Sequence, residues 1–351
     1  MTLKDQDFDN LKEFDGHKLI SYFSDQETGL KAIVAIHRGG LKNPSFGATR
    51  IWNYASEHEA AKDAIKLSRI MSYKSALAGL KYGGAKGVII SSNLSKTRKK
   101  ALIKSYSKHL NYLDGHFITG ADVGINPEDV RLMRLNCPYI VGIGVDPVRF
   151  TSLGVYFSLQ VCLKEVFNSD NLTNRTFAIQ GVGKTGTGLL RKIYHQAKKI
   201  YISDVNKNRV NLIKKQFPKV EFIPPSEIYK QEVDVYSPCA LSNAINSKNL
   251  ATFKCKIIMG SANSQLENAQ IGEKLFKLGI LYAPDYVVNA GGLIAVVDEY
   301  EHKNYSEERI QKRVQNIKNT LKTIIDKSKA TKKSTNIVAD EMAEKLFKKF
   351  V

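Results

Sequence analysis

The stretch AIQGVGKTGTG, residues 178 to 188, is the most informative about the fold, and it fits two different nucleotide-binding motifs. Ala178 and four further residues precede Gly183, Lys184 and Thr185, which is the spacing of a relaxed phosphate-binding P-loop. Counted instead from Gly181, with glycines again at 183 and 186, the same letters form the G-x-G-x-x-G turn of a dinucleotide-binding fold. The first motif predicts an ATPase or GTPase, and the second predicts a dehydrogenase.

The surrounding sequence favours the dinucleotide motif. The strand-like run TFAIQ precedes the turn, a helix begins near residue 184, and a second apolar run, KIYISD, ends at Asp204. The offset from Gly181 is 204 − 181 = 23 residues, near the roughly 20 expected for an acid that binds the adenosine ribose hydroxyls. This acid favours NAD over NADP, although Lys207 and Arg209 lie nearby. A P-loop needs a later strand that ends in a magnesium-binding aspartate, and Asp234 lies inside the run EVDVYSP.

Hydrophobic periodicity predicts two α/β domains. From about residue 175 to 283, short apolar runs alternate with helical patterns, as in a doubly wound parallel sheet of the Rossmann type. The first part predicts strands at 31–37 and 85–90, helices at 56–79 and 95–112, and a helix that starts at Asn126 and Pro127. Ser56 and Glu59 predict a capping box at the start of the helix at 56–79. We expect a substrate domain at 1–145, an NAD domain at 146–330 and a C-terminal helix at 331–351 that packs on the first domain, with the active site in the cleft between the two domains.

Composition excludes several classes of protein. The 351 residues are about right for two domains. Cysteines stand only at 137, 162, 239 and 255, without a C-x-x-C pair, so we expect reduced thiols in a cytoplasmic protein and no metal site. The N-terminus MTLKDQDFDNLKEFDG is polar, and no apolar run approaches the roughly 18 residues of a membrane span. We therefore expect no membrane partner.

The net charge of +19 raises the possibility of a nucleic-acid partner. The lysines, however, are spread along helix-like segments, and the densest runs, KTRKK at 96–100 and KSKATKK at 327–333, contain no aromatic residues that could stack on bases. A solvated, lysine-rich surface is the better interpretation, and we expect no specific nucleic-acid binding.

The stretch MSYKSALAGLKYGGAKGVII, residues 71 to 90, contains two lysines beside tightly spaced glycines. If Lys74 and Lys86 converge in one cleft, like-charge repulsion and desolvation lower their pKa values, so that one can act as a base while the other binds a carboxylate. On these residues alone, two ordinary surface lysines would be the simpler interpretation.

This stretch closely resembles the signature of the glutamate, leucine, phenylalanine and valine dehydrogenases, most of all the leucine and phenylalanine members. Further resemblances follow in the same order along most of the chain: GATRIW (47–52), ITGADVG (118–124), AIQGVGKTG (178–186), SDVNK (203–207), SPCALSNAIN (237–246), GSANSQL (260–266) and YAPDYVVNAGG (282–292). The resemblance implies a nicotinamide-dependent amino acid dehydrogenase.

By this resemblance, Lys74 binds the substrate α-carboxylate, and Lys86 orients or activates the water that attacks the imino carbon. Asp122 would move protons to and from the amino group. Gly47 and Gly84 would let the backbone approach the substrate closely.

The resemblance also implies a set of residues for the nicotinamide cofactor. Asn289 and Asn263 would hold the substrate or the nicotinamide, and Thr151 would contact the nicotinamide amide. Cys239 and Ala240 would lie beside the adenosine. The fingerprint residues Gly181, Gly183, Lys184 and Gly186 would bind the pyrophosphate of NAD, with Asp204 on the ribose.

The residues that match the side-chain pocket of the relatives are all uncharged: Phe46, Gly120, Leu293 and Val296. Glutamate members carry a lysine where this chain has Phe46, and burial of an unpaired carboxylate is costly. The implied reaction is therefore reversible oxidative deamination of an apolar amino acid (leucine, valine, isoleucine or phenylalanine) to its 2-oxo acid, ammonium and NADH. A homo-oligomer is expected, and a non-catalytic amino-acid or nucleotide sensor on the same scaffold is the alternative.

The chain departs from the family pattern at several points. The segment GIGVDPVRFTS (142–152) is short, Ala48 stands where a glycine is usual, and Ala121 precedes Asp122 where relatives often have an acid. Lys184 is uncommon within the fingerprint. These changes affect the expected rate and specificity more than the type of reaction.

Overall fold

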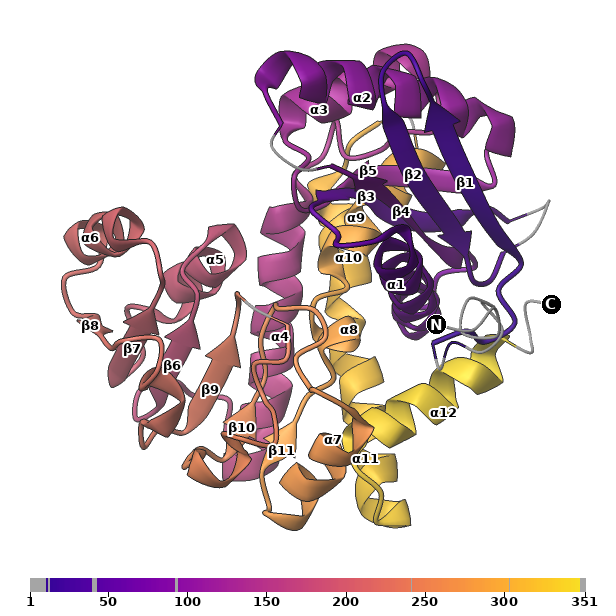
Figure 1. The fold of residues 1–351 in the computed structure, drawn as a ribbon. Coiled ribbons are helices and arrows are strands. Elements are labelled where there is room, and N and C mark those ends of the chain that lie inside the picture. Colours follow the sequence, from indigo (N-terminus) through magenta and orange to yellow (C-terminus); the bar gives the residue numbers. More distant parts are fainter. Residues whose placement is uncertain are drawn as a thin grey trace. The chain divides into compact units, whose positions relative to one another are not determined.

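The computed structural model describes residues 11, 13–39, 43–91, 94–240, 242–302 and 304–347, and it divides into two compact units (Figure 1). The first unit comprises Met1–Asp146, Val296–Tyr305 and Ala343–Val351. The second comprises Pro147–Ala295 and Ser306–Met342. No pattern in the sequence indicated that residues 296–305 group with the first unit.

The first unit is built on a five-stranded mixed sheet with the order β1-β2-β4-β3-β5. The strands are β1 (Leu19–Asp25), β2 (Leu30–Ile36), β3 (Ser45–Trp52), β4 (Gly83–Ile90) and β5 (Phe117–Ala121). β2 runs antiparallel to β1 and β4, whereas β3 is parallel to both β4 and β5. The central strand β4 is buried along almost its whole length.

Helices cover both faces of this sheet, because successive strand residues point to opposite sides. Helix α1 (Glu57–Leu77) packs Ala60, Ala64 and Ile65 against Ile33 and Val88. On the other face, α2 (Lys96–Leu110) and α3 (Pro127–Asn136) close a larger apolar core. Lys86 lies two residues before Val88, so it belongs to the face that α1 covers.

The caps of two helices explain where they begin. Ser56 accepts a hydrogen bond from the Glu59 backbone at 3.1 Å, but the Glu59 carboxylate binds the Ala55 N–H instead of the Ser56 N–H. The predicted reciprocal capping box at α1 is therefore only half formed. At α3, Asn126 and Asp129 form a complete capping box with Pro127 in the first turn between them. The box satisfies N–H groups that the first turn of a helix leaves without partners.

The second unit confirms the predicted doubly wound sheet, with six parallel strands in the order β11-β10-β9-β6-β7-β8. The strands are β6 (Thr176–Gln180), β7 (Lys199–Ser203), β8 (Glu221–Phe222), β9 (Val235–Pro238), β10 (Ile257–Ile258) and β11 (Leu281–Tyr282). The strand order reverses between β6 and β9. Open α/β sheets bind ligands at such a switch point, beyond the carboxyl ends of the strands.

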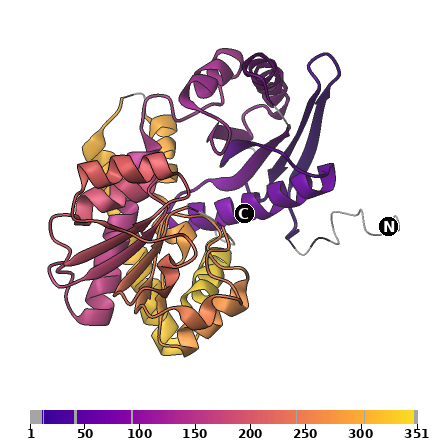
Figure 2. The same ribbon diagram turned by 60° about the vertical axis from the view of Figure 1, so that its left-hand side comes forward.

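Helices lie on both faces of this second sheet (Figure 2). Those within the second unit are α4 (Pro147–Phe167), α5 (Lys184–Ile193), α6 (Lys207–Gln216), α7 (Ala269–Lys277), α8 (Asp285–Val288), α10 (Glu307–Gln315) and α11 (Ile317–Thr331). Two further helices, α9 (Gly291–Glu301) and α12 (Thr335–Phe347), contribute residues to both units. The described part of residues 291–347 is thus mostly helical.

Candidate functional site

Lys86 and Asp122, the two predicted catalytic residues, form a buried ion pair in the first unit. Lys86 is 5% exposed on β4, and its Nζ contacts Asp122 Oδ2 directly. Asp122 follows the last residue of β5, and β3 lies between the two strands. The Nε of Arg50, on β3, donates to the same carboxylate oxygen at 3.1 Å. Three adjacent strands therefore bring two cations and one carboxylate together.

These two cations decide the charge of Asp122. Burial raises the pKa of the Asp122 carboxyl, but the Lys86 ammonium and the Arg50 guanidinium outweigh that effect and hold the pKa well below its usual range. Asp122 is therefore ionised at neutral pH. Arg50 is held in turn by Asp63 at 3.0 Å. Sequence reasoning missed the role of Arg50, although this residue lies within the GATRIW motif.

Lys74 lies in the last turn of α1 and is 8% exposed. Close packing brings that end of α1 onto the strand that carries Lys86: a Cβ at Gly84 would lie 2.0 Å from the Ser72 backbone nitrogen. A Cβ at Gly47 would lie 1.8 Å from the Ala85 carbonyl oxygen. Both glycines are thus required by the packing of the first unit itself, and their approach to a substrate stays a prediction.

An aromatic cluster surrounds the first predicted pocket residue. Phe46 is 0% exposed, and its ring centroid lies 4.7 Å from Tyr82 and 5.2 Å from Tyr300. Val296 stands one helical turn before Tyr300 on α9. Sequence reasoning missed both tyrosines. Tyr82 is brought to Phe46 by the pairing of β3 with β4, and Tyr300 by the return of α9 to the first unit.

The other predicted pocket residues are equally apolar. A Cβ at Gly120 would approach the Val141 carbonyl oxygen to 3.0 Å, so the adjoining segment already fills part of the space that the missing side chain leaves. Leu293 is buried within the second unit. None of the four predicted pocket residues carries a charge.

In the second unit, the three fingerprint glycines differ in the space around them. Gly181 has φ +96°, and a Cβ there would lie 2.5 Å from the Ala240 Cβ. A Cβ at Gly186 would lie 2.0 Å from the Gly181 carbonyl oxygen, which places α5 tightly against the turn. Gly183, in contrast, has no heavy atom within 4 Å of its Cβ direction. That open space at the N-terminus of α5 fits a pyrophosphate, since the helix there presents free N–H groups and a positive dipole end.

The predicted ribose acid, Asp204, follows β7 and touches this turn: its Oδ2 accepts from the Val182 N–H at 3.1 Å. Val205, the next residue, is an exposed apolar side chain that sequence reasoning did not single out. Lys184 is the exposed first residue of α5. The turn, the acid and the lysine therefore gather at the carboxyl ends of β6 and β7.

The remaining predicted cofactor residues lie nearby in the second unit. Cys239 and Ala240 follow β9, and Cys239 donates its N–H to the Gln180 carbonyl at the end of β6. The Asn289 amide donates to Asn263 at 2.8 Å, whereas Asn289 Oδ1 is buried and has no hydrogen-bond partner among the described residues. A buried orphan acceptor of this kind fits a ligand N–H donor. Thr151 donates its hydroxyl to the Pro147 carbonyl.

The P-loop interpretation fails on the position of Asp234. This residue precedes β9, and its Oδ2 accepts from the Thr176 N–H at 2.8 Å. Thr176 is the first residue of β6, so Asp234 lies at the opposite end of the strands from the glycine turn. It therefore cannot hold a magnesium ion beside a phosphate bound at residues 181–186.

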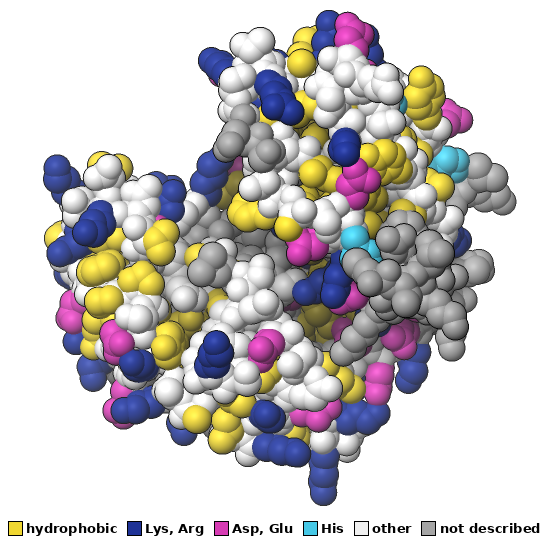
Figure 3. Space-filling view, viewed as in Figure 1, with side chains coloured by type: hydrophobic (Ala, Val, Ile, Leu, Met, Phe, Trp, Pro, Cys, Tyr) yellow, Lys and Arg dark blue, Asp and Glu magenta, His cyan; other side chains and the backbone are white. Residues whose placement is uncertain are grey.

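On the face shown in Figure 3, Lys and Arg side chains are interspersed with acidic and uncharged ones and form no continuous stripe. Within the described ranges, no helix has both the length and the apolar character needed to cross a membrane.

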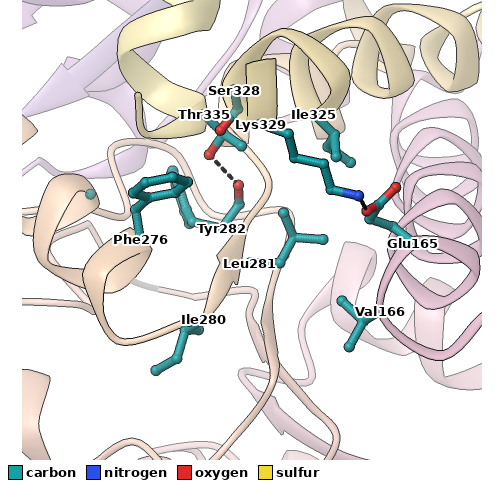
Figure 4. Close-up of a pocket in the computed structure, with 12 residues that line it drawn as sticks. Glu165, Val166, Phe276, Ile280, Leu281, Tyr282, Ile325, Ser328, Lys329 and Thr335 are labelled. Atoms are coloured by element: carbon teal, nitrogen blue, oxygen red, sulfur yellow. Dashed lines mark hydrogen bonds and ion pairs between the residues drawn. The ribbon is translucent and has the colours of Figure 1, made fainter. Parts of the chain in front are cut away.

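A separate cavity of about 200 Å³ lies in the second unit, between α4, α7, β11 and α11 (Figure 4). Its walls are mainly apolar, and its polar groups bind one another: Lys329 pairs with Glu165, and Thr335 donates to the Tyr282 carbonyl. No predicted site residue lines this cavity. It is therefore not the candidate active site.

Comparison with known proteins identifies two matching family models. Residues 19–138 match the Glu/Leu/Phe/Val dehydrogenase dimerisation domain, and residues 198–348 match Glutamate/Leucine/Phenylalanine/Valine dehydrogenase. A leucine dehydrogenase of Bacillus cereus is 38% identical over 96% of this chain and 92% of its own length. An L-tryptophan dehydrogenase of Nostoc punctiforme is 39% identical over 96% of this chain and 95% of its own length.

The solved structures agree with this assignment. The crystal structure of the Nostoc punctiforme L-tryptophan dehydrogenase matches with a TM-score of 0.79 and 38% identity, over 95% of this chain and 97% of that one. A hetero-hexameric glutamate dehydrogenase from Thermus thermophilus, at 18% identity, shares the fold with a TM-score of 0.78 over 95% of this chain and 89% of that one. The chain belongs to the glutamate, leucine, phenylalanine and valine dehydrogenase family and is an NAD(P)-dependent amino acid dehydrogenase.

Proposed function

We propose that this enzyme catalyses the NAD-dependent, reversible oxidative deamination of an apolar L-amino acid to its 2-oxo acid, ammonium and NADH. The observation that carries the proposal is the buried Lys86–Asp122 ion pair with Arg50 on the same carboxylate. It combines a carboxylate that stays ionised at neutral pH with an ammonium group beside it. Such a pair suits a reaction that must remove a proton from an amine and activate a water molecule.

Each residue of the group has a distinct task in this proposal. Lys74 binds the substrate α-carboxylate, and Asp122 accepts a proton from the α-ammonium group. The α-carbon then loses a hydride while the nitrogen lone pair forms the C=N bond. A water molecule positioned by Lys86 adds to that carbon and transfers one proton to the nitrogen. The C–N bond then breaks, ammonia leaves with the bonding electron pair, and the hydroxyl releases its remaining proton to solvent as the oxo group forms.

The second unit supplies the cofactor residues. NAD, when bound there, would supply the hydride acceptor. Gly181, Gly183, Gly186 and the exposed Lys184 would surround its pyrophosphate, and Asp204 would accept from a ribose hydroxyl. Asn289 Oδ1 would accept from an amide N–H of the nicotinamide or from the substrate, which would pair an atom that is otherwise buried without a partner. Four further residues have the roles that the family resemblance implies. Asn263 would hold the substrate or the nicotinamide, Thr151 would contact the nicotinamide amide, and Cys239 and Ala240 would lie beside the adenosine.

An apolar substrate is supported by the residues around Phe46. The acidic side chain of a substrate such as glutamate would find no cation among the proposed pocket residues, which are all uncharged: Phe46, Gly120, Leu293 and Val296. The named relatives act on leucine and tryptophan, and a valine dehydrogenase of Streptomyces albus is 34% identical over 94% of this chain. Leucine, valine, isoleucine and phenylalanine are accordingly the first amino acids to test, with tryptophan added by the comparison.

We also propose a homo-oligomer in the cytoplasm. The match of residues 19–138 to a dimerisation domain supports self-association, and the edge strand β1 exposes Leu19 and Tyr22. Four free cysteines suit a reducing compartment. Light scattering coupled to size-exclusion chromatography would give the mass directly, and a monomer at micromolar concentration would contradict self-association.

The deciding experiment is NADH consumption with ammonium and a panel of 2-oxo acids. We expect turnover with 4-methyl-2-oxopentanoate, 3-methyl-2-oxobutanoate, phenylpyruvate or indole-3-pyruvate, and little with 2-oxoglutarate, whose second carboxylate finds no cation. Lys86→Met is the negative control. Binding of NADH and of an apolar amino acid without any turnover would support the sensor alternative, and turnover with 2-oxoglutarate alone would contradict the pocket assignment.

A further inference from the structure

The orientation of the Asn289 amide is set by the loop at residues 260–265, which follows β10. This loop provides two acceptors for Asn289 Nδ2: the Ser261 carbonyl oxygen at 3.2 Å and Asn263 Oδ1 at 2.8 Å. A backbone carbonyl can only accept, so the nitrogen of the Asn289 amide must face the loop. Asn289 Oδ1 is then left buried without a hydrogen-bond partner among the described residues. The loop thus decides which atom of Asn289 is available to a ligand.

Gln265 holds the backbone of this loop. Its Nε2 donates to the Gly260 carbonyl oxygen at 2.8 Å and to the Ala262 carbonyl oxygen at 2.9 Å. These two carbonyls stand on either side of the Ser261 carbonyl in the chain. With both of them bound to Gln265, the Ser261 carbonyl is the one that reaches Asn289.

Gln265 also ties the loop to the helix that ends at Asn289. Its backbone N–H donates to Asp285 Oδ2 at 2.8 Å, and Asp285 is the first residue of α8. Asn289 caps the other end of α8 and donates its N–H to the Asp285 carbonyl. Gln265 is 0% exposed, Asp285 4% and Asn289 5%. The side chain of Gln265 therefore binds the loop, its backbone binds α8, and the connection is closed to solvent.

A buried amide at position 265 is unfavourable for packing alone. Gln265 Oε1 is buried and has no hydrogen-bond partner within the described ranges, and a buried polar atom without a partner costs free energy. An apolar side chain of similar length would fill the space without that cost. What the amide adds is the pair of hydrogen bonds to the loop that orients Asn289.

We propose that Gln265 is a positioning residue for the nicotinamide half of the cofactor. By holding the loop, it keeps Asn289 Oδ1 in place to accept from the carboxamide N–H of the nicotinamide. Gln265 acts through Asn289 and touches neither cofactor nor substrate. The inference rests on the proposed function, which assigns Asn289 Oδ1 to a ligand N–H, and it commits that N–H to the carboxamide.

The first test measures binding without catalysis. Isothermal titration calorimetry of the full-length protein compares NADH with ADP-ribose, which lacks the nicotinamide. Gln265→Met removes both donated hydrogen bonds with a side chain of similar length. We expect it to weaken NADH about tenfold, the upper part of the range for a lost hydrogen bond, and ADP-ribose by less than about twofold. Asn289→Ala should show the same selective loss.

A double variant tests whether Gln265 acts through Asn289. Once Asn289→Ala has removed the amide, Gln265 has nothing left to orient. The double variant Gln265→Met/Asn289→Ala should therefore bind NADH no more weakly than Asn289→Ala alone. Additive losses would overturn the inference.

Asn336 provides a matched control elsewhere in the second unit. It is a buried amide that donates to the Ala269 carbonyl at 3.3 Å, and its Oδ1 also lacks a partner among the residues described. Asn336→Leu and Gln265→Met should both lower the midpoint of thermal unfolding of the apoprotein. Asn336→Leu should nevertheless leave the ratio of NADH affinity to ADP-ribose affinity unchanged. An equal change in that ratio would assign the effect to lost stability and overturn the inference.

Gln265→Glu keeps the test decisive if Gln265→Met does not fold. A protonated carboxyl has one O–H donor and an ionised one has none, so at least one of the two hydrogen bonds to the loop is lost in either state. The same selective weakening of NADH is expected, and equal weakening of NADH and ADP-ribose, or none, would overturn the inference. If Asn289→Ala keeps the wild-type ratio, the proposed role of Asn289 fails together with the inference. If wild type binds neither ligand, the proposed function itself fails.

Discussion

At the scale of single residues, two neighbouring cations keep the buried Asp122 carboxyl ionised. A buried carboxylate tends to hold its proton, but Lys86 and Arg50 supply two positive charges on one oxygen. The expectation that Lys74 and Lys86 act mainly on each other therefore omitted the carboxylate that contacts Lys86 directly. This carboxylate also explains how a nearly inaccessible ammonium group is tolerated in the first unit.

Asp122→Asn tests the catalytic role of the carboxylate. The amide cannot take up the proton of the substrate ammonium group, so we expect kcat to fall about 10²-fold or more, while NADH affinity is unchanged because the cofactor residues lie in the second unit. The matched control is Asp63→Asn, since Asp63 also binds Arg50 but not Lys86. Steady-state kinetics on both variants decides the matter, and an equal loss in the two would assign the effect to Arg50 alone.

The same substitution has a predicted effect on stability that depends on pH. The pKa of Asp122 is lower in the folded protein than in the unfolded chain, where it is about 3.9. Its stabilising contribution is therefore complete above that unfolded value and is lost as the pH falls through the folded one. We expect Asp122→Asn to lower the free energy of unfolding by about 3 kcal/mol near neutral pH, because Lys86 loses its buried partner, and by less in acid. Urea unfolding at several pH values measures the difference, and a pH-independent loss would contradict this origin.

At the scale of elements, the turn between β6 and α5 contains two kinds of glycine. Gly181 and Gly186 are required by the packing of the fold, whereas we expect Gly183 to be required by the bound cofactor. Gly186→Ala places a Cβ 2.0 Å from the Gly181 carbonyl oxygen, so it should destabilise the second unit even without cofactor. Gly183→Ala meets no atom within 4 Å and should leave thermal unfolding unchanged while it weakens NADH binding. Fluorescence titration with NADH and calorimetry of the apoprotein test both. If Gly183→Ala binds NADH normally, the pyrophosphate does not approach this face of the turn.

The elements themselves were largely predictable, because periodicity and caps act locally. The runs TFAIQ and KIYISD became β6 and β7, and the Asn126 cap formed as expected. The contacts made by particular side chains were less predictable. Glu59 bonds to Ala55 instead of Ser56, and Arg50 reaches Asp122 across 72 positions of sequence. The first contact depends on which backbone N–H the Glu59 side chain reaches, and the second depends on strand order, which no local pattern specifies.

At the scale of the whole molecule, the chain passes between its two units after Asp146, Ala295, Tyr305 and Met342. One of these passages lies inside α9, whose first residues belong to the second unit and whose last residues belong to the first. Within the first unit, Glu299 of α9 accepts hydrogen bonds from three successive backbone N–H groups, at 2.6 Å from Gly142, 3.1 Å from Ile143 and 2.7 Å from Gly144. It therefore joins two of the segments that connect the units.

Glu299→Ala should release this connection without removing any group assigned to chemistry. The three amides lose a charged acceptor, so their hydrogen exchange should accelerate about tenfold or more, as measured by mass spectrometry on peptides that cover 142–144. We expect kcat/KM for the amino acid to fall as well, because the same segment begins at Val141, which lies against Gly120. NADH affinity should not change. Glu301→Ala, which removes the partner of Tyr82 from the same helix, is the matched control and should leave exchange at 142–144 unchanged. Unaltered exchange in Glu299→Ala would mean that the backbone of this segment is held by its own conformation, and the carboxylate would then be a consequence of that conformation and not its cause.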